Sequence, residues 1–502
     1  MSLRSFTLHD LIERNAAQHG ARTAFVADGE RVSHAEFAAR GAQLAAGLAA
    51  AGVGRGDRVA VLAHNGLAFV DLLAAAARLG AILVPINWRL SAEEVAHVLA
   101  DTTPRLLVAA PEFHALLAAA DLAAVQRMTT APDATAPWQP LASLYRDEAP
   151  VPAAPVDDDA GLAVVHTAAV GGRARGALLT HRGLLAAAHK QVHAWGLTAD
   201  DVQAGVLPLF HLAGIGMTLA LLAAGGASLL MARFDPKALV EASDVHGASV
   251  LGSFPPMLSS VLDAAAAAGS PLRSLRVVSG IDAPQTLERF AAACPHADFW
   301  VAYGQTETSG SVTMGRWRDR PGSAGRPVEQ HVVLLVDDED RPVAAGATGE
   351  IVVRGPMVFA GYWGLEDDNA FTFRGGWHHT GDMGRFDDEG FLWYAGRSPA
   401  KELIKPGGEN VYPAEVERAL REHPEVREAV VFGVSDAQWG EAVKAVCVRT
   451  PGSQLVAESL IEFVGQRIAR YKKPKHVVFV EALPVSAAGA PDRAAVKAAH
   501  GG

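Results

Sequence analysis

Apolar and polar positions in the first hundred residues alternate between helical spacing and short apolar runs. Ala- and Leu-rich helical stretches are separated by runs such as residues 58–63 (RVAVLA) and 81–86 (AILVPI). Short apolar runs that alternate with amphipathic helices are typical of helices packed on a parallel sheet. The pattern therefore predicts an α/β fold.

One stretch has the composition of a membrane span. Residues 212–232 (LAGIGMTLALLAAGGASLLMA) carry no charge, and the segment has roughly the length that crosses a bilayer. Gly225 and Gly226 interrupt it, and paired glycines are strong breakers of regular structure. We therefore predict a buried helix, a turn and a short core strand, and no membrane span.

The pattern changes twice towards the C-terminus. Residues 340–396 switch to short strands and Gly-rich turns, which predicts a small β-rich subdomain. A charged stretch then leads into an acidic helix and two Val-rich runs, at 429–434 and 443–449. We predict a large N-terminal domain (1–396), a hinge (397–401) and a small α+β domain (402–502).

Charge and cysteine content exclude several classes of protein. The 502 residues include 44 Lys and Arg against 55 Asp and Glu, a net charge of -11. Nucleic acids and anionic membranes bind most strongly to proteins with a surplus of positive charge, so neither is expected as the main partner. Cys294 and Cys447 form no C-x-x-C, so we expect no disulfide framework, no cysteine zinc site and a cytoplasmic location.

Three motifs carry candidate chemistry. They are YGQTE at 303–307, WHHTGD at 377–382 and GRSPAKELIKPGGENVYPAEVE at 396–417. An aromatic ring, a hydroxyl, carboxylates and an arginine beside glycine turns are the groups with which a protein binds a nucleotide. Each motif alone is compatible with a turn carrying solvated charges. In this order the motifs resemble those of the adenylate-forming superfamily, specifically its acyl-CoA synthetases, and the resemblance covers nearly the whole chain.

The resemblance implies an adenylate site. Its members would be Gly280, Ile281, Asp282, Tyr303, Thr306, Asp382 and Arg397. Tyr303 would stack on adenine with the backbone of 280–282 at its other face, and Thr306 would touch the phosphate. Asp382 and Arg397 would contact the ribose, since a carboxylate can accept from both ribose hydroxyls.

The resemblance also implies three catalytic positions. Glu307 is similar to the family's magnesium-side carboxylate and is the one metal ligand we expect, if Mg²⁺ is used at all. Lys401 occupies the hinge about which the small domain would swing between half-reactions. His211 occupies the place of a gating residue beside the acyl carbonyl, with a core-facing histidine as the alternative.

Coenzyme A positions are present as well. The resemblance assigns them to Gly407, Gly408, Trp439, Tyr471, Lys473 and Lys475. For the lysines the alternative is a solvated basic end of a helix. A hydrophobic acyl pocket is expected from Leu212, Ile215, Phe254, Ile281 and Val312.

The chain departs from the family in its phosphate loop. The family reads T-S-G-T-T-G-x-P-K-G, whereas residues 167–176 read TAAVGGRARG. The hydroxyls, a glycine and the lysine are replaced by Ala168, Ala169, Val170, Gly171 and Arg175. At the C-terminus, Ala490 stands where the family has the lysine that bridges carboxylate and α-phosphate, and alanine supplies no charge.

These losses affect only the ATP-cleaving half of the reaction. We therefore expect a non-adenylating acyl-CoA ligase that converts a preformed acyl-adenylate and CoA to acyl-CoA and AMP, without ATP or Mg²⁺. A separate adenylating ligase would be its partner, as in split ligase systems of bacterial natural-product pathways of the platensimycin/platencin type. The alternatives are a complete synthetase in which Arg175 replaces the lysine, a non-catalytic protein that binds acyl-CoA or adenylate, and a transferase or hydrolase on the same fold.

Overall fold

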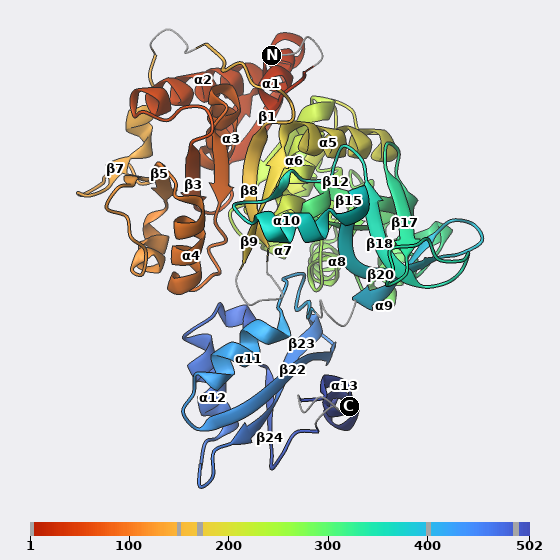
Figure 1. The fold of residues 1–502 in the computed structure, drawn as a ribbon. Coiled ribbons are helices and arrows are strands. Elements are labelled where there is room, and N and C mark those ends of the chain that lie inside the picture. The colour runs from red at the N-terminus through yellow and green to blue at the C-terminus, as the bar shows by residue number, and fades with distance from the viewer. Residues whose placement is uncertain (1–4, 148–151, 168–173, 398–402, 485–490, 502) are drawn as a thin grey trace.

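The computed structural model describes residues 5–147, 152–167, 174–397, 403–484 and 491–501. A large body of mixed helices and sheets lies above a small C-terminal domain, drawn in blue in Figure 1. This arrangement confirms the predicted α/β class.

An eight-stranded sheet organises the first part of the large body. Its strands are β3 (Arg58–Leu62), β4 (Ile82–Pro85), β5 (Leu106–Ala109), β6 (Gln126–Thr129), β7 (Gln139–Pro140), β8 (Gly161–Thr167), β9 (Arg175–Thr180) and β19 (Gly361–Tyr362). They lie in the order β19-β9-β8-β4-β3-β5-β6-β7. The apolar runs predicted at 58–63 and 81–86 are β3 and β4, which pair in parallel.

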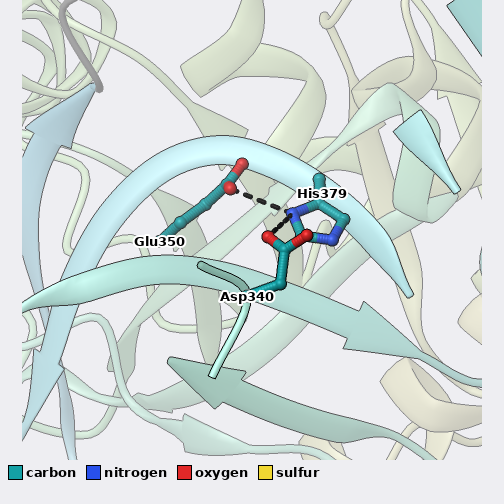
Figure 2. A group of neighbouring side chains, drawn as sticks. All are labelled: Asp340, Glu350 and His379. Atoms are coloured by element: carbon teal, nitrogen blue, oxygen red, sulfur yellow. Dashed lines mark hydrogen bonds and ion pairs between the residues drawn. The ribbon is translucent and has the colours of Figure 1, made fainter. Parts of the chain in front are cut away.

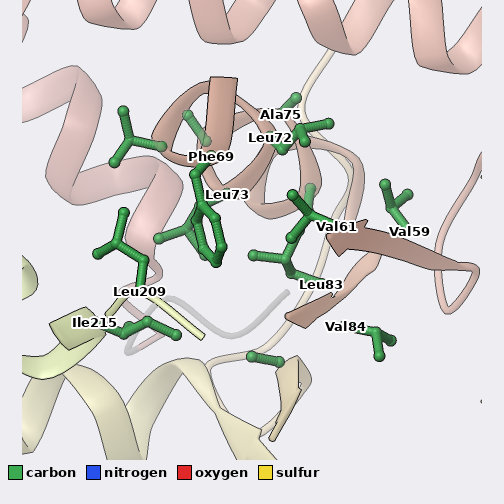
Figure 3. Packing of buried hydrophobic residues seen from close by; sticks show 14 of the residues in the cluster. Val59, Val61, Phe69, Leu72, Leu73, Ala75, Leu83, Val84, Leu209 and Ile215 are labelled. Atoms are coloured by element: carbon green, nitrogen blue, oxygen red, sulfur yellow. The ribbon is translucent and has the colours of Figure 1, made fainter. Parts of the chain in front are cut away.

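Three helices belong to this half: α2 (His34–Ala50), α3 (Leu67–Leu79) and α4 (Ala92–Thr102). Helices α2 and α4 begin at reciprocal capping boxes, Ser33 with Glu36 and Ser91 with Glu94, which satisfy backbone donors that a helix end leaves unpaired. Their apolar faces meet the sheet in the core shown in Figure 3, where Phe69 and Leu72 of α3 lie over the strands.

A nine-stranded sheet forms the second part. Its strands are β1 (Thr23–Ala27), β2 (Glu30–Ser33), β10 (Val202–Gly205), β11 (Ala227–Leu230), β12 (Val250–Ser253), β13 (Val277–Gly280), β14 (Asp298–Gln305), β15 (Gly310–Arg316) and β16 (Arg326–Pro327), in the order β16-β15-β14-β13-β12-β10-β11-β1-β2. Its helices are α1 (Leu8–His19), α5 (His181–Trp195), α6 (Leu212–Ala224), α7 (Pro236–His246), α8 (Met257–Ala268) and α9 (Pro284–Ala293).

The uncharged stretch at 212–232 lies inside this half. It folds as the buried helix α6, a turn at Gly225 in the left-handed conformation (φ 76°), and strand β11, as predicted. Glycine adopts that conformation without the cost that a Cβ imposes. No helix in the described ranges is both long and apolar enough to cross a membrane.

Two smaller sheets complete the fold. A four-stranded sheet contains β17 (Val332–Val336), β18 (Gly349–Arg354), β20 (His378–Phe386) and β21 (Leu392–Arg397), with α10 (Glu366–Thr372) between β18 and β20 in the chain. The sheet begins before the predicted start at residue 340. Its first strand, β17, precedes the turn at which the sequence pattern changes.

The small domain has a three-stranded sheet. Its elements are α11 (Pro413–Arg421), β22 (Val426–Asp436), β23 (Gly440–Arg449), α12 (Ala457–Gly465), β24 (His476–Val480) and α13 (Arg493–His500). The Val-rich runs predicted at 429–434 and 443–449 are β22 and β23. The small domain also has the 3-10 helix η7 (Arg470–Lys472). Short 3-10 helices in the large domain are η1 (Pro111–Leu117), η2 (Leu141–Leu144), η3 (Thr306–Thr308), η4 (Trp317–Asp319) and η5 (Arg374–Gly376).

Candidate adenylate and coenzyme A site

Asp382 and Arg397 lie opposite each other on two neighbouring strands. Strands β20 and β21 are antiparallel, and their register pairs these two residues directly. The Arg397 Nε lies 2.9 Å from Asp382 Oδ1; the Asp382 side chain is buried and that of Arg397 is 12% exposed. Burial opposes the charge of Arg397, but the carboxylate of Asp382 and the surrounding tyrosines raise its pKa above the ordinary value. The Arg397 guanidinium therefore keeps its charge beside Asp382.

Strand β14 brings the YGQTE motif to the same carboxylate. The Tyr303 hydroxyl donates to Asp382 Oδ2 at 2.8 Å, and Gln305 Nε2 donates to the same oxygen at 2.5 Å. Thr306 follows at the start of η3. Burial, with Asp382 nearby, raises the pKa of Tyr303 and keeps its ring neutral. All three motifs, which lie far apart in the sequence, thus meet at the Asp382 carboxylate.

The segment 280–282 follows β13, the neighbour of β14 in the sheet. A Cβ at Gly280 would lie 1.7 Å from the backbone oxygen of Ser253, so only glycine fits there. Asp282 Oδ2 and Ser253 Oγ are buried without a hydrogen-bond partner among the described residues. An unpaired carboxylate oxygen beside an exposed backbone can accept from an amino group such as that of adenine, so these residues fit the nucleotide expected here.

Glu307 is the centre of a second polar cluster. Its carboxylate accepts hydrogen bonds from the Tyr362 hydroxyl at 2.9 Å and from Thr167 Oγ1 at 3.2 Å. Burial opposes its ionisation, but His378 and the hydrogen bonds it accepts lower its pKa overall. Glu307 is therefore a buried, ionised carboxylate, the kind of group that a hard cation such as Mg²⁺ would require.

Arg175 opens strand β9 at the position of the family's loop lysine. Its Nη1 donates to Asp368 Oδ2 at 2.8 Å, and its Nη2 donates to the Tyr362 hydroxyl at 3.1 Å. The guanidinium carbon lies 3.9 Å from the centre of the Tyr362 ring. Its charge is thus engaged by an ion pair, a hydrogen bond and a cation–π contact.

Six of the residues predicted from the sequence lie outside the described ranges: Ala168, Ala169, Val170 and Gly171 of the phosphate loop, Lys401 at the hinge, and Ala490 near the C-terminus.

His211 lies where the two domains meet. It precedes α6, and its Nε2 lies 3.2 Å from Glu409 Oε2 of the small domain. Arg89 of the large domain contacts the same carboxylate. Burial opposes ionisation of Glu409, yet His211 and Arg89 together lower its pKa to about 2. The His211 side chain is 37% exposed, so the alternative of a core-facing histidine is wrong.

The glycine pair of the KPGGEN segment packs between two aromatic rings. A Cβ on Gly407 would lie 2.8 Å from the Trp439 ring, and a Cβ on Gly408 would lie 3.1 Å from the Phe254 ring. Both glycines have positive φ, 59° and 86°. Only residues without a Cβ let this loop approach the large domain so closely.

The remaining coenzyme A positions lie on the small domain. Trp439 is 41% exposed, and Lys473 and Tyr471 are half-buried. The Lys475 amine contacts Asp436 at 2.5 Å, an exposed ion pair of small energetic value that a phosphate can replace. The exposed indole and the nearby lysines are compatible with stacking on a base and contact with phosphate.

The five expected acyl-pocket residues belong to different parts of the core and the surface. Leu212 and Ile215 belong to the large core cluster that spans both big sheets, and Val312 packs with Tyr303 in another cluster. Phe254 is half-buried against Gly408, and Ile281 is 52% exposed. Their role in acyl binding stays a prediction.

Asp340, Glu350 and His379 form a cluster beside the WHHTGD motif (Figure 2). His379 Nδ1 lies 2.9 Å from Glu350 Oε2. Arg374 already pairs with both carboxylates, since its Nε and Nη2 donate to Asp340 at 3.0 Å and to Glu350 at 3.1 Å. The other Glu350 oxygen accepts the Gly381 backbone N–H at 2.8 Å. The cluster is therefore an ion-pair network that holds the backbone of Gly381, the residue before Asp382 in β20.

Sequence reasoning missed four polar members of the site: Gln305, Glu350, Tyr362 and Glu409. Gln305 and Glu409 stand inside the motifs already quoted, so the signal was present. Glu350 and Tyr362 lie in strand-rich segments where they look like ordinary solvated positions.

Comparisons with known proteins identify the family. A sequence model described as AMP-binding enzyme matches residues 12–363, and one described as AMP-binding enzyme C-terminal domain matches residues 415–490. The chain is 36% identical over 496 residues to the indoleacetate–CoA ligase of Aromatoleum aromaticum, covering 96% of both chains. It is 34% identical over 481 residues to a feruloyl-CoA synthase of Amycolatopsis, covering 95% of both.

Solved structures agree. The o-succinylbenzoate CoA synthetase of Bacillus subtilis, as a double mutant with its product analogue, is 27% identical and superposes with a TM-score of 0.85 over 97% of this chain and 98% of that one. The same enzyme with its acyl-adenylate intermediate superposes with a TM-score of 0.71 over 99% of each chain, again at 27% identity. With the paired domains, the shared motifs and relatives that match from end to end, the chain belongs to the AMP-binding enzyme family and is an acyl-CoA ligase of the adenylate-forming superfamily.

Proposed function

We propose that this ligase catalyses only the second half-reaction of its family. It accepts a preformed acyl-adenylate, the CoA sulfur attacks the acyl carbonyl, and the acyl–phosphate bond breaks to release AMP. A separate adenylating ligase supplies the adenylate. The observation that carries this proposal is Arg175, whose charge is already engaged by Asp368 and Tyr362.

Arg175 stands at the position of the family's lysine in the degenerate phosphate loop. To hold a phosphate of ATP it would have to leave Asp368 and Tyr362, and charge-assisted hydrogen bonds contribute about 1.5–3 kcal/mol each. The hydroxyls that would share the phosphate are absent from the loop sequence, and Ala490 removes the second lysine. Each lost donor of this kind costs about a hundred- to a thousandfold in rate.

The groups that thioester formation requires are present. Asp382 and Arg397 would hold the ribose of the acyl-adenylate, while Tyr303 would pack against its base. CoA would enter along Trp439 and the two glycines of the KPGGEN segment. AMP is the leaving group, and its phosphate oxygen takes the electron pair of the C–O bond that breaks.

The arrangement of the two domains supports the same half-reaction. The B. subtilis synthetase superposes better in its product-analogue complex than in its acyl-adenylate complex, with TM-scores of 0.85 and 0.71. The Glu409 contacts with His211 and Arg89 join the domains in this arrangement.

A complete ATP-dependent synthetase is the second candidate. Arg175 contacts Tyr362, which in turn contacts Glu307, so the cation lies one side chain away from the expected magnesium carboxylate. Arginine keeps a phosphate-binding charge where the family has lysine.

The test separates the two half-reactions. The protein is given ATP, Mg²⁺, labelled pyrophosphate and a panel of hydrophobic acids that begins with indoleacetate and ferulate, the acids named by its relatives. We expect no acid-dependent pyrophosphate exchange. The same acids supplied as adenylates with CoA should yield acyl-CoA and AMP.

A matched pair of variants tests the role of Arg175. Asp368→Asn releases the guanidinium, whereas Asp367→Asn changes an exposed neighbour on the same helix. Robust exchange by the wild type overturns the proposal in favour of the complete synthetase. Binding of AMP and CoA by calorimetry without turnover of any adenylate supports a non-catalytic partner protein instead.

A further inference from the structure

A small cavity lies away from the adenylate site, between the second half of α5 and the segment that precedes β17. Its volume is about 250 Å³, and its lining includes His189, Lys190, His193, Glu329, His331 and Met357. Neither half-reaction uses any of these residues.

Lys190 contributes an amine to this cavity without a carboxylate to balance it. Its Nζ donates to the backbone oxygen of Ser311 at 2.7 Å, and no Asp or Glu among the described residues lies within ion-pair distance. Burial lowers the pKa of Lys190 to about 7. An ordinary lysine has a pKa of about 10.4, so near pH 7 the Lys190 amine is neutral and nucleophilic far more often than an exposed lysine.

The other charged and titratable groups that face Lys190 come from two elements. On α5, His193 Nε2 lies 3.3 Å from Glu329 Oε1, and His189 lies one turn earlier on the exposed side. From the segment before β17, His331 Nδ1 donates to the Glu329 backbone oxygen at 3.0 Å, and burial lowers its pKa so that the ring stays neutral. The one carboxylate, Glu329, is thus engaged by His193.

We propose that Lys190 is an acylation site, whose amine accepts a short acyl group from an acyl-adenylate. The Nζ lone pair attacks the acyl carbonyl, an amide N–C bond forms, the C–O bond to AMP breaks, and the amine proton passes to water. The cavity is smaller than the 300–1,000 Å³ typical of drug-sized ligand sites, so it fits an acyl chain of a few carbons. The choice of donor rests on the proposed function.

Acylation of Lys190 would affect the adenylate site through strand β15. Ser311, which Lys190 contacts, pairs with Gly304 of the YGQTE motif. An amide at Lys190 carries no charge and one N–H in place of three, so it holds the Ser311 carbonyl less well. We expect an acylated chain to bind AMP several-fold more weakly.

A chemical donor tests the amine independently of the enzymatic activity. The folded protein is treated with limiting N-hydroxysuccinimidyl acetate between pH 6 and 9, and each lysine is quantified by peptide mass spectrometry. We expect the Lys190 rate to reach half its maximum near pH 7 and to exceed that of the exposed Lys237 by at least about tenfold at pH 7. Acetylation of Lys190 no faster than that of Lys237 overturns the proposal.

Acetyl-adenylate without CoA tests the donor. We expect one acetyl group per chain at Lys190 and none in Lys190→Arg, and modification spread over exposed lysines overturns the proposal. Lys190→Gln, which removes the charge, should weaken AMP binding several-fold in calorimetry while Lys190→Arg does not. A failure of thioester formation with any acid would contradict the proposed function but leave these lysine measurements interpretable.

Discussion

Glu94 holds the two domains together through a buried lysine of the small domain. Lys472 Nζ contacts the carboxylates of both Glu94 and Glu415, and Glu94 also accepts the Ala469 backbone N–H at 3.0 Å. The side chains of Lys472 and Glu415 are 5% and 8% exposed. Because Glu94 comes from α4 of the large domain and the others from the small domain, this cluster stabilises the arrangement in which the domains lie.

Glu94→Gln removes this charge while leaving the fold of α4 intact. Glutamine also completes a capping box, so the contact with Ser91 survives. Removing one partner of an isolated buried ion pair costs about 3–5 kcal/mol, because a charge is left unpaired. Here Lys472 keeps Glu415, so the loss is one charge-assisted hydrogen bond, about 1.5–3 kcal/mol. That corresponds to about a ten- to hundredfold shift away from the observed arrangement.

Steady-state thioester formation from an acyl-adenylate measures this shift. We expect kcat/KM for CoA to fall by about ten- to a hundredfold in Glu94→Gln, with a thermal midpoint close to that of the wild type. Glu93→Gln is the matched control, since Glu93 is exposed one residue away in the same first turn. Small-angle scattering should show a more extended molecule for Glu94→Gln alone. Unchanged kinetics and scattering in Glu94→Gln would refute the reasoning.

Three further changes test the site. Asp382→Ala should weaken AMP binding by about ten- to a hundredfold in calorimetry, because a buried carboxylate that accepts charged-group hydrogen bonds is lost; wild-type affinity would mean that the nucleotide binds elsewhere. Lys473→Glu should raise the KM for CoA more than it lowers kcat, and the wild type should already discriminate against dephospho-CoA; equal KM values for the two thiols would assign Lys473 to a solvated surface. Glu350→Gln should raise the KM for acyl-adenylate several-fold, because Glu350 accepts the Gly381 N–H next to Asp382. Glu339→Gln is the exposed control. No difference between the two variants would show that Glu350 does not position the Gly381 backbone.

The sequence predicted elements whose signals are local. Apolar runs of strand length predicted β3 and β4, and the glycine pair after residue 224 predicted where α6 ends. The meeting of Tyr303, Asp382 and Arg397 was predicted through the resemblance, and the structure brings the three side chains together.

Contacts between distant segments could not be predicted in this way. Glu94 and Lys472 are separated by 378 positions, and each looks like an ordinary charged residue in its own segment. The acyl pocket shows the same limit, because an apolar side chain indicates burial but not the cavity it faces. Val312 is fully buried beside Tyr303, whereas Ile281 is 52% exposed.

Arg397 is shared between the two domains. It closes the last strand of the large domain, where it pairs with Asp382, and its Nη1 also donates to the Tyr412 hydroxyl of the small domain at 3.1 Å. Any movement that withdraws Tyr412 takes away one partner of this guanidinium, and a nucleotide that binds Asp382, as proposed, would change another. If the proposed reaction releases AMP from Asp382, we predict that this side chain couples product release to movement of the small domain, and that a mutation at Tyr412 alters the order in which AMP and the thioester leave.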